Sequence, residues 1–387
     1  MVQKQIKQVE QAKAKQTLTR PLRDSTSQST LFDIEPDWRE EWWGMPSFEM
    51  GDARPLHRVT VNFMTTEDLR EFADKLNAQL TTSTDSMFYP QQETLRGEYE
   101  YHGPAADTRY PVYIPSKGRA DCQRTGRALD QMGVSYKFVV ESDEVAEYSK
   151  HVGSGRVLTL PFNNLGQGSI PARNWIWDHA ASLGHKRHWI MDDNITSFAR
   201  CTHNRRVCVR SGVLFRAIED WVDRYENVAI AGPHHKGFVP DRDPNLAPFL
   251  LNSRVYSCSL IDTDAPYRWR GRYNEDTDLC LRMLKDGWCT ALFRALLMDK
   301  GATQTMKGGN TDHVYNTGDH RRAFADSLKE QHPDVVTVTW KFNRWHHHVD
   351  YSPFKNNRLK IRSDVVATRG IDEYGLKLVK LKRKNED

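Results

Sequence analysis

The sequence has no long apolar run, no clustered cysteines and no apolar leader. No segment approaches the roughly 18 consecutive apolar residues that a membrane-spanning helix needs, so we expect no membrane partner. Residues 1–20 are polar, and we expect no signal peptide. The six cysteines are spread along the chain without a CxxC pair, which disfavours a zinc ribbon and favours free thiols in a reducing compartment. We therefore expect a cytoplasmic protein.

Net charge is also small. The chain carries 55 Lys and Arg against 51 Asp and Glu, for a formal net charge of +4. This balance does not by itself indicate a nucleic-acid partner, although it allows a basic face on a nearly neutral body. What the sequence does have is length and aromatic residues: its 387 residues include 11 Trp, 14 Tyr and 15 Phe, enough for a sizeable core.

Composition divides the chain into four predicted parts. These are a disordered or helical tail with a linker at 1–30, a small α+β module at 31–100, a large α/β domain at 101–330, and a basic, aromatic extension at 331–387. In the second part, alternation predicts strands at 58–63 and near 86–89 around a helix at 66–80 that Thr66 caps. We expect this module to dock or stabilise the larger domain.

From residue 110 onward, predicted strands and helices alternate. Apolar runs predict strands at 110–116, 135–141, 156–162, 188–193, 227–233 and briefly near 290–293. Helical patterns fall at 119–133, 170–183, 211–224 and after Tyr273. Such alternation predicts a mostly parallel sheet flanked by helices, with its site at the carboxyl ends of the strands.

Two acidic clusters are candidates for metal binding or for proton transfer. Asp192-Asp193-Asn194 follows a predicted strand, where adjacent carboxylates suit Mg²⁺ or Mn²⁺; a polar turn is the alternative. Glu275-Asp276 opens a predicted helix behind Asn274, where acidic residues are ordinary partners of the helix dipole. In the functional interpretation, one of these two carboxylates takes a proton from an acceptor hydroxyl.

Two further segments have residues that suit the binding of a phosphate group. Pro115-Ser116-Lys117-Gly118-Arg119 joins the first strand to its helix, but it lacks the spacing of a Walker loop. The glycine-bearing segment 163–168 is followed by Arg173 and Asn174 at a helix start. Each segment alone is equally compatible with a plain turn between a strand and a helix.

Taken in this order, the four elements resemble the GT-A glycosyltransferases, and among them the TET-associated glycosyltransferase family of phages. The resemblance rests on the blocks YIPSKGRA, MDDN and NEDTDLCLRML and covers about residues 110–320. It implies a GT-A type fold, a UDP-sugar donor, a Mn²⁺ or Mg²⁺ cofactor and an inverting reaction. The implied acceptor is 5-hydroxymethylcytosine in DNA, with a TET-like dioxygenase acting earlier in the pathway.

The resemblance also implies roles for individual residues. Asp276 matches the catalytic base, with Glu275 as the alternative. Asn194 stands where many families have a second aspartate, so Asp193 is expected to substitute for that ligand. The implied nucleotide-sugar contacts are Pro115, Ser116, Lys117, Arg119, Glu141, Arg173, Asn174 and Asp192. The implied metal ligands are Asp192, Asp193, Asn194 and His313.

A DNA acceptor requires cations for phosphates and aromatic rings for bases. The candidates, which could equally be solvated basic loops, are Arg205, Arg206, Arg268, Trp269, Arg270, Arg272, Arg344 and Trp345. The neighbouring His346–His348 run could alternatively bind a metal. Three rival functions remain open: a glycosyltransferase with a glycan or protein acceptor, a non-catalytic nucleotide- or DNA-binding module, and, more distantly, a nucleotidyltransferase.

Overall fold

The computed structural model describes residues 37–52, 57–89, 98–240, 243–271, 273–301, 321–341, 343–368 and 370–381. The chain divides into two compact units, Met1–Glu40 and Glu41–Asp387. In the first unit, the described part is the short 3-10 helix η1 (Trp38–Glu40). The second unit holds every other element described below. The candidates His313 and Arg272, and the predicted tail at 1–30, lie outside the described residues.

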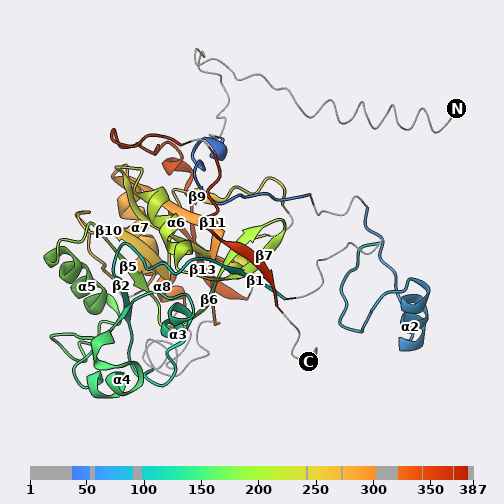
Figure 1. Ribbon diagram of the computed structural model, residues 1–387, viewed down its shortest axis with the longest axis horizontal. Coiled ribbons are helices and arrows are strands. Elements are labelled where there is room, and N and C mark those ends of the chain that lie inside the picture. Colours follow the sequence, from blue (N-terminus) through green and yellow to red (C-terminus); the bar gives the residue numbers. More distant parts are fainter. Residues whose placement is uncertain are drawn as a thin grey trace, which may run out of the picture. The chain divides into compact units, whose positions relative to one another are not determined.

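A twelve-stranded sheet forms the centre of the second unit (Figure 1). Its order is β14-β1-β7-β6-β11-β8-β10-β5-β2-β3-β4, with β9 paired to β11. The register shows that β6, β9, β10 and β14 run against the other strands, so most strands point the same way. The bounds are β1 Tyr99–His102, β2 Val112–Pro115, β3 Lys137–Val140, β4 Val157–Thr159, β5 Arg187–Met191, β6 Ile195–Thr202, β7 Arg205–Arg210, β8 Val228–His235, β9 Phe249–Leu251, β10 Cys258–Asp262, β11 Cys289–Lys300 and β14 Lys377–Lys380.

Most of the described helices pack against this sheet, and a separate hairpin lies in the chain between β11 and β14. The α-helices are α2 Thr66–Lys75, α3 Arg124–Asp130, α4 Val145–Val152, α5 Ile170–Ser182, α6 Val213–Val222, α7 Glu275–Lys285 and α8 Arg321–Gln331. Short 3-10 turns are η2 Ser154–Arg156, η3 Lys236–Phe238 and η5 Ser352–Phe354, and the hairpin is β12 Val336–Lys341 with β13 Arg344–Val349. The predicted α/β class with a large, mostly parallel sheet is confirmed. None of the described helices is long and apolar enough to cross a membrane.

The predicted elements of the sheet are found, with shifted ends. Predicted strand 135–141 appears as β3 and predicted helix 170–183 as α5. Predicted strand 290–293 was too short, because β11 continues to Lys300. The basic segment around Arg205 is not a loop but the start of β7, which forms a hairpin with β6.

The segment 57–89 differs from its prediction. α2 is present, but Thr65, not Thr66, caps it: Asp68 N–H donates to Thr65 Oγ1 and Thr65 N–H to the Asp68 carboxylate. The strands predicted at 58–63 and 86–89 are wrong, since no strand occurs within the described residues 57–89. Alternation alone cannot make a strand where no neighbour supplies backbone partners, and Val59 there is 72% exposed.

The strand that carries the first acidic cluster is fixed firmly. Every residue of β5 is buried, between β10 on one side and β2 on the other. Trp189 of this strand packs its ring against Phe215 of α6 and donates Nε1–H to the buried Glu219. The Arg187 guanidinium donates to Asp223 and to the Val228 carbonyl. A fully buried strand whose Arg187 and Trp189 side chains are hydrogen-bonded gives the residues at its end a rigid support.

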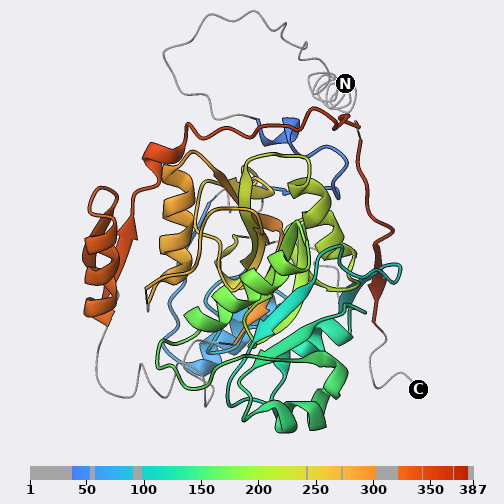
Figure 2. The ribbon, with the colours of Figure 1, turned by 90° about the vertical axis from the view of Figure 1, so that its left-hand side faces the viewer.

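The chain beyond α7 returns to the sheet and also adds a second small core. β14 pairs antiparallel with β1, so residues on both sides of the large predicted domain share its sheet. Leu281 and Leu284 of α7 pack with Leu328 of α8 and Val336 of β12. Figure 2 shows α8 and the hairpin beside α7. The predicted domain boundaries stay predictions.

Candidate active site

The ends of several strands meet at one edge of the sheet. β2, β3, β5 and β11 run in the same direction, so the residues after each of them lie at the same edge. β10 runs the opposite way and therefore begins there, just after Ser257. Gly232 of β8 allows this approach, because a Cβ at that position would collide with the Cys258 carbonyl oxygen. This edge carries most of the predicted site residues.

Asp192 follows β5 and is held by cations. Arg173 Nη2 donates to Asp192 Oδ1 at 3.0 Å, and Lys300 Nζ lies 3.5 Å from Oδ2. Its backbone is fixed as well, because its N–H donates to the Ser257 carbonyl and its carbonyl accepts from Thr125 Oγ1. Burial raises the pKa of Asp192, but Lys300 and Arg173 outweigh burial and bring the pKa below its ordinary value. Asp192 is therefore an anion at neutral pH.

Asp193 points to the loop after β2. Ser116 Oγ donates to Asp193 Oδ2 and Arg119 Nη1 donates to Oδ1, both at 2.6 Å. Burial nevertheless keeps the pKa of Asp193 above its ordinary value, against the effect of Arg119. Both oxygens of Asp193 are thus engaged by the segment that was predicted to hold nucleotide.

Arg173 of α5 joins the two acidic clusters. The nitrogen that donates to Asp192 also lies 4.0 Å from Glu275 Oε1, at the start of α7. The guanidinium carbon stands 4.6 Å from the centre of the Trp269 ring, a cation–π contact. Two segments far apart in the sequence therefore share one cation, and this contact brings the acidic clusters into one site.

Trp269 packs against Arg173 and is itself held in place by hydrogen bonds. It is 2% exposed, and its backbone N–H donates to Asn174 Oδ1 while its carbonyl accepts from Asn174 Nδ2. The Asn174 amide, predicted to contact nucleotide, is therefore used to clamp this loop. The base-stacking role predicted for Trp269 does not fit its burial, because the ring lies beneath Arg173 and has no exposed face.

The second acidic cluster presents two different carboxylates. Burial raises the pKa of Glu275, Arg173 opposes this and Asp276 adds to it. Asp276 Oδ1 accepts from the Thr277 N–H at 2.7 Å, whereas its Oδ2 has the Arg254 guanidinium at 4.0 Å. Asn274 caps α7 in a left-handed conformation with φ 56°, which turns the chain into the helix. Asp276 thus keeps one oxygen that is only loosely held.

The loops after β2, β3 and β4 are tied together by one lysine. Lys117 Nζ donates to Glu141 Oε2 and to Asn164 Oδ1. Pro115 ends β2, and the Ser116 N–H donates to the Val139 carbonyl of β3. The predicted contacts Pro115, Ser116, Lys117, Arg119 and Glu141 thus lie around one loop cluster.

Residues 110–309 match the family described as TET-Associated Glycosyltransferase, and this span is just over half of the 387 residues. The chain belongs to this family. The earlier resemblance is confirmed, and the site described above belongs to a glycosyltransferase. No curated protein matches the chain. The matched span includes both acidic clusters, whereas α8 and the β12–β13 hairpin lie beyond it.

The donor atoms of this glycosyltransferase can be compared with those that a divalent cation requires. The described residues contain no group of three or more His, Cys, Asp or Glu arranged for a metal ion. Mg²⁺ needs less than this, since it binds through one or two protein oxygens together with substrate phosphates. Asp193 is committed to Ser116 and Arg119, but Asn194 Oδ1 is a buried acceptor without a donor in the described part of the chain. Asp192 and Asn194 are therefore the oxygen donors that suit such a cation by their chemistry, although the two Asp192 oxygens face Arg173 and Lys300 in this structure.

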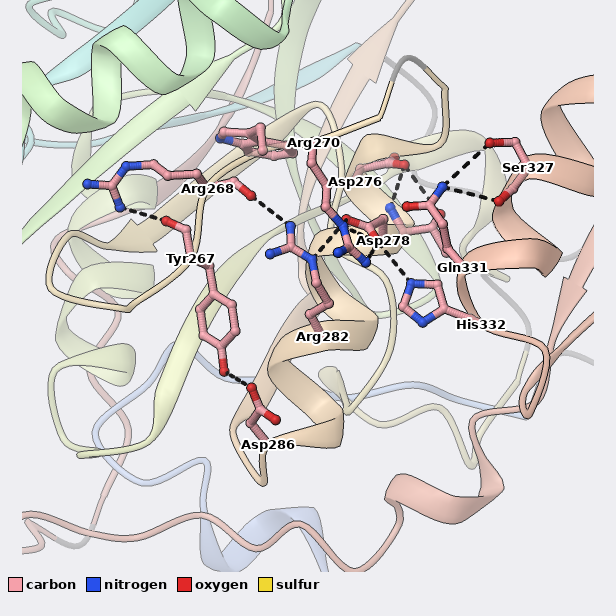
Figure 3. Close-up of polar contacts among 12 residues, drawn as sticks. Tyr267, Arg268, Arg270, Asp276, Asp278, Arg282, Asp286, Ser327, Gln331 and His332 are labelled. Carbon is pink, nitrogen blue, oxygen red and sulfur yellow. Dashed lines mark hydrogen bonds and ion pairs between the residues drawn. The ribbon is translucent and has the colours of Figure 1, made fainter.

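The other basic candidates of the glycosyltransferase fall in different places. Arg205 and Arg206 open β7, which runs parallel to β5, so they lie at the edge opposite Asp192 and five strands away, about 24 Å across the sheet. This position does not fit a shared site. Arg268 donates to Asp178. Arg270 donates to the buried Asp278 (Figure 3). Arg344 and Trp345 lie on the hairpin after the matched span.

Sequence reasoning missed several residues of the site, among them Lys300 and Ser257. Lys300 at the end of β11 donates to Ser257 Oγ at 2.6 Å as well as facing Asp192. Ser257 is in the left-handed region at φ 61°, a strained conformation for serine that is often found at functional sites. Neither belongs to a local motif, and Lys300 is 108 positions from Asp192. A correct prediction of the length of β11 would have placed Lys300 at the carboxyl end of that strand, but the strand was predicted too short.

Proposed function

We propose that this glycosyltransferase moves a sugar from a UDP-sugar to the hydroxymethyl group of 5-hydroxymethylcytosine in DNA, with inversion at the anomeric carbon. The contact that carries the proposal is Arg173 between Asp192 and Glu275, because it puts a donor-side anion and a candidate base in one site. Membership of a TET-associated family supports the DNA acceptor. A reaction that oxidises 5-methylcytosine must supply such an acceptor, which favours a TET-like dioxygenase as the preceding enzyme.

The donor is proposed to bind at the loop cluster after β2, β3 and β4. Arg119 and Lys117 supply cations there, and Arg173 and Lys300 face the adjacent Asp192. Cations held in place beforehand stabilise the charge that grows on departing UDP. Asp192 and Asn194 would hold a Mn²⁺ or Mg²⁺ ion, which when bound neutralises diphosphate charge as a Lewis acid.

The acceptor is proposed to react at Asp276. The hydroxymethyl oxygen forms the new bond to the anomeric carbon while the bond from that carbon to the diphosphate oxygen breaks, and UDP departs with the bonding pair. The hydroxyl proton passes to Asp276 Oδ2, the oxygen left loosely held by Arg254. Glu275 is the alternative base, because burial raises its pKa and so increases its affinity for a proton.

A product assay tests this function. The full chain is incubated with a panel of UDP-sugars, Mn²⁺ and matched DNA duplexes containing 5-hydroxymethylcytosine, 5-methylcytosine or cytosine. The DNA is then digested to nucleosides, and the masses of these nucleosides are measured by mass spectrometry. We expect a hexose-sized mass increase on 5-hydroxymethyl-2′-deoxycytidine alone. UDP release that requires an added glycan or protein, with no mass gained by any nucleoside, would instead support the glycan or protein acceptor.

A further inference from the structure

The hairpin that follows the family-matched span has two distinct faces. Directly opposed residues of β12 and β13 point to the same side, so Val336, Trp340, Trp345, His347 and Val349 share one face. Val336 belongs to the small core with α7 and α8, and Val349 packs against that core. The base of the hairpin is therefore anchored, and the same face continues outward to the two tryptophans.

The end of this face exposes a large aromatic ring. Trp340 is 54% exposed, and its ring centre lies 5.2 Å from that of Trp345 at 73°. The Arg322 guanidinium of α8 stands 4.5 Å over the Trp345 ring. An exposed tryptophan supported by a second ring and a cation presents a rigid surface suited to stacking on a flat ligand.

The opposite face at the same end is cationic. Lys341 and Arg344 are directly opposed across the strands, and both are exposed. Like charges opposed in this way destabilise a hairpin unless an anion lies between or beside them. Arg344 Nε donates to His346 Nε2 at 2.8 Å, and the neighbouring Arg322 of α8 has Asp326 at 3.4 Å. We call Arg322, Trp340, Lys341, Arg344 and Trp345 the Trp340 tip.

The hairpin that carries the Trp340 tip packs on the helix that carries the proposed base. Val336 and Val349 lie in one core with Leu281 and Leu284 of α7, and the first turn of α7 holds Asp276. His347 lies between Val349 and Trp345 on the same face of the hairpin, and burial and Arg254 lower its pKa to about 4 while Asp276 opposes them. Arg254 is the same residue that lies 4.0 Å from Asp276. Two residues of strand span about 7 Å, comparable to the spacing of neighbouring nucleotides.

We propose that the Trp340 tip is the docking surface for the DNA acceptor, where Trp340 stacks on a base beside the modified nucleotide and Lys341 and Arg344 contact its phosphates. The proposal rests on the proposed DNA acceptor and adds where that DNA binds. Aromatic stacking together with phosphate contacts is the combination that binds unpaired strands. A base rotated out of the duplex would leave such an unpaired neighbour for Trp340.

Binding and donor chemistry can be measured separately. Affinity for a labelled oligonucleotide containing 5-hydroxymethylcytosine is measured by fluorescence anisotropy over a salt series, and UDP-sugar hydrolysis is followed without DNA. Trp340→Ala should weaken DNA binding about tenfold, and Trp340→Phe should restore most of it. The double variant Lys341→Gln, Arg344→Gln should reduce the slope of log K against log salt by about 1.5. UDP-sugar hydrolysis should be unchanged in all of them.

Matched controls come from surfaces away from the hairpin. Leu183→Ala removes a similarly exposed side chain (57%) at the end of α5, and Lys377→Gln with Lys380→Gln removes two charges from β14. Both should bind DNA as the wild type does. Wild-type affinity and salt slope in the Trp340 tip variants, with glycosylation intact, would overturn the docking surface but leave the function standing. A wild-type protein that neither binds nor modifies DNA would overturn both.

Discussion

Asp278 offers a measurable test of how the site is supported. Figure 3 shows this carboxylate between the guanidinium groups of Arg270 and Arg282, with His332 beside it. It is 1% exposed and accepts from all three side chains. Burial alone would raise the pKa of Asp278, but His332 and the two arginines bring it down to about 2.

The low pKa of Asp278 gives both the size of its contribution to stability and the way that contribution changes with pH. The pKa of Asp278 falls from a reference of 3.8 to about 2. This shift corresponds to about 2.5 kcal/mol of stability. Because the folded pKa lies below the unfolded one, that stability is complete above about pH 4 and is lost as the pH falls towards 2. Asp278→Asn removes the buried anion that Arg282 and His332 face, and we expect it to cost about 2.5 kcal/mol at pH 7.

The assay is urea unfolding of the wild type and Asp278→Asn at pH 7 and at a series of pH values down to the acid limit of solubility. The difference between the two proteins should shrink as the pH falls from 4 towards 2, since the unfolded wild type then binds a proton at Asp278, and near pH 2 the folded wild type also loses the anion. Asp326→Asn is the matched control, because its partner Arg322 is an exposed neighbour one helical turn away, and it should change stability by about 0.5 kcal/mol or less. A pH-independent difference, or a loss below 0.5 kcal/mol at pH 7, would refute this reasoning.

The remaining predictions concern chemistry. Asp276→Asn should keep UDP binding, seen by calorimetry, and lose about 10²–10⁴ in transfer rate, whereas an equal loss in Glu275→Gln alone would reassign the base. Lys300→Met removes a cation that lowers the pKa of Asp192, so the acid limb of the kcat/KM profile should move to higher pH; an unmoved limb contradicts this. Asn194→Asp should lower the Kd for Mn²⁺, and chelation should abolish transfer until Mn²⁺ is restored; metal-insensitive transfer would remove the cation from the proposal.

Local motifs in the sequence were sufficient for much of the fold and for the individual clusters. Strand β5 followed by Asp192 and Asp193 is visible as an apolar run and two carboxylates, and helix α5 as an apolar period. Their convergence also follows from sequence, because alternating strands and helices imply a parallel sheet whose strand ends meet. The same logic failed at 58–63, where an alternating pattern has no neighbouring strand in the described part of the chain.

The partners of those clusters were decided by tertiary structure alone. Asp193 is engaged by Ser116 and Arg119, Trp269 is buried under Arg173, and Lys300 arrives from a strand 108 positions away. A sequence gives the side chains that are present and the period at which apolar residues recur, and this period indicates secondary structure. Which cation faces which carboxylate depends on the register and direction of strands that are distant in the chain, and those are fixed only when the whole sheet packs.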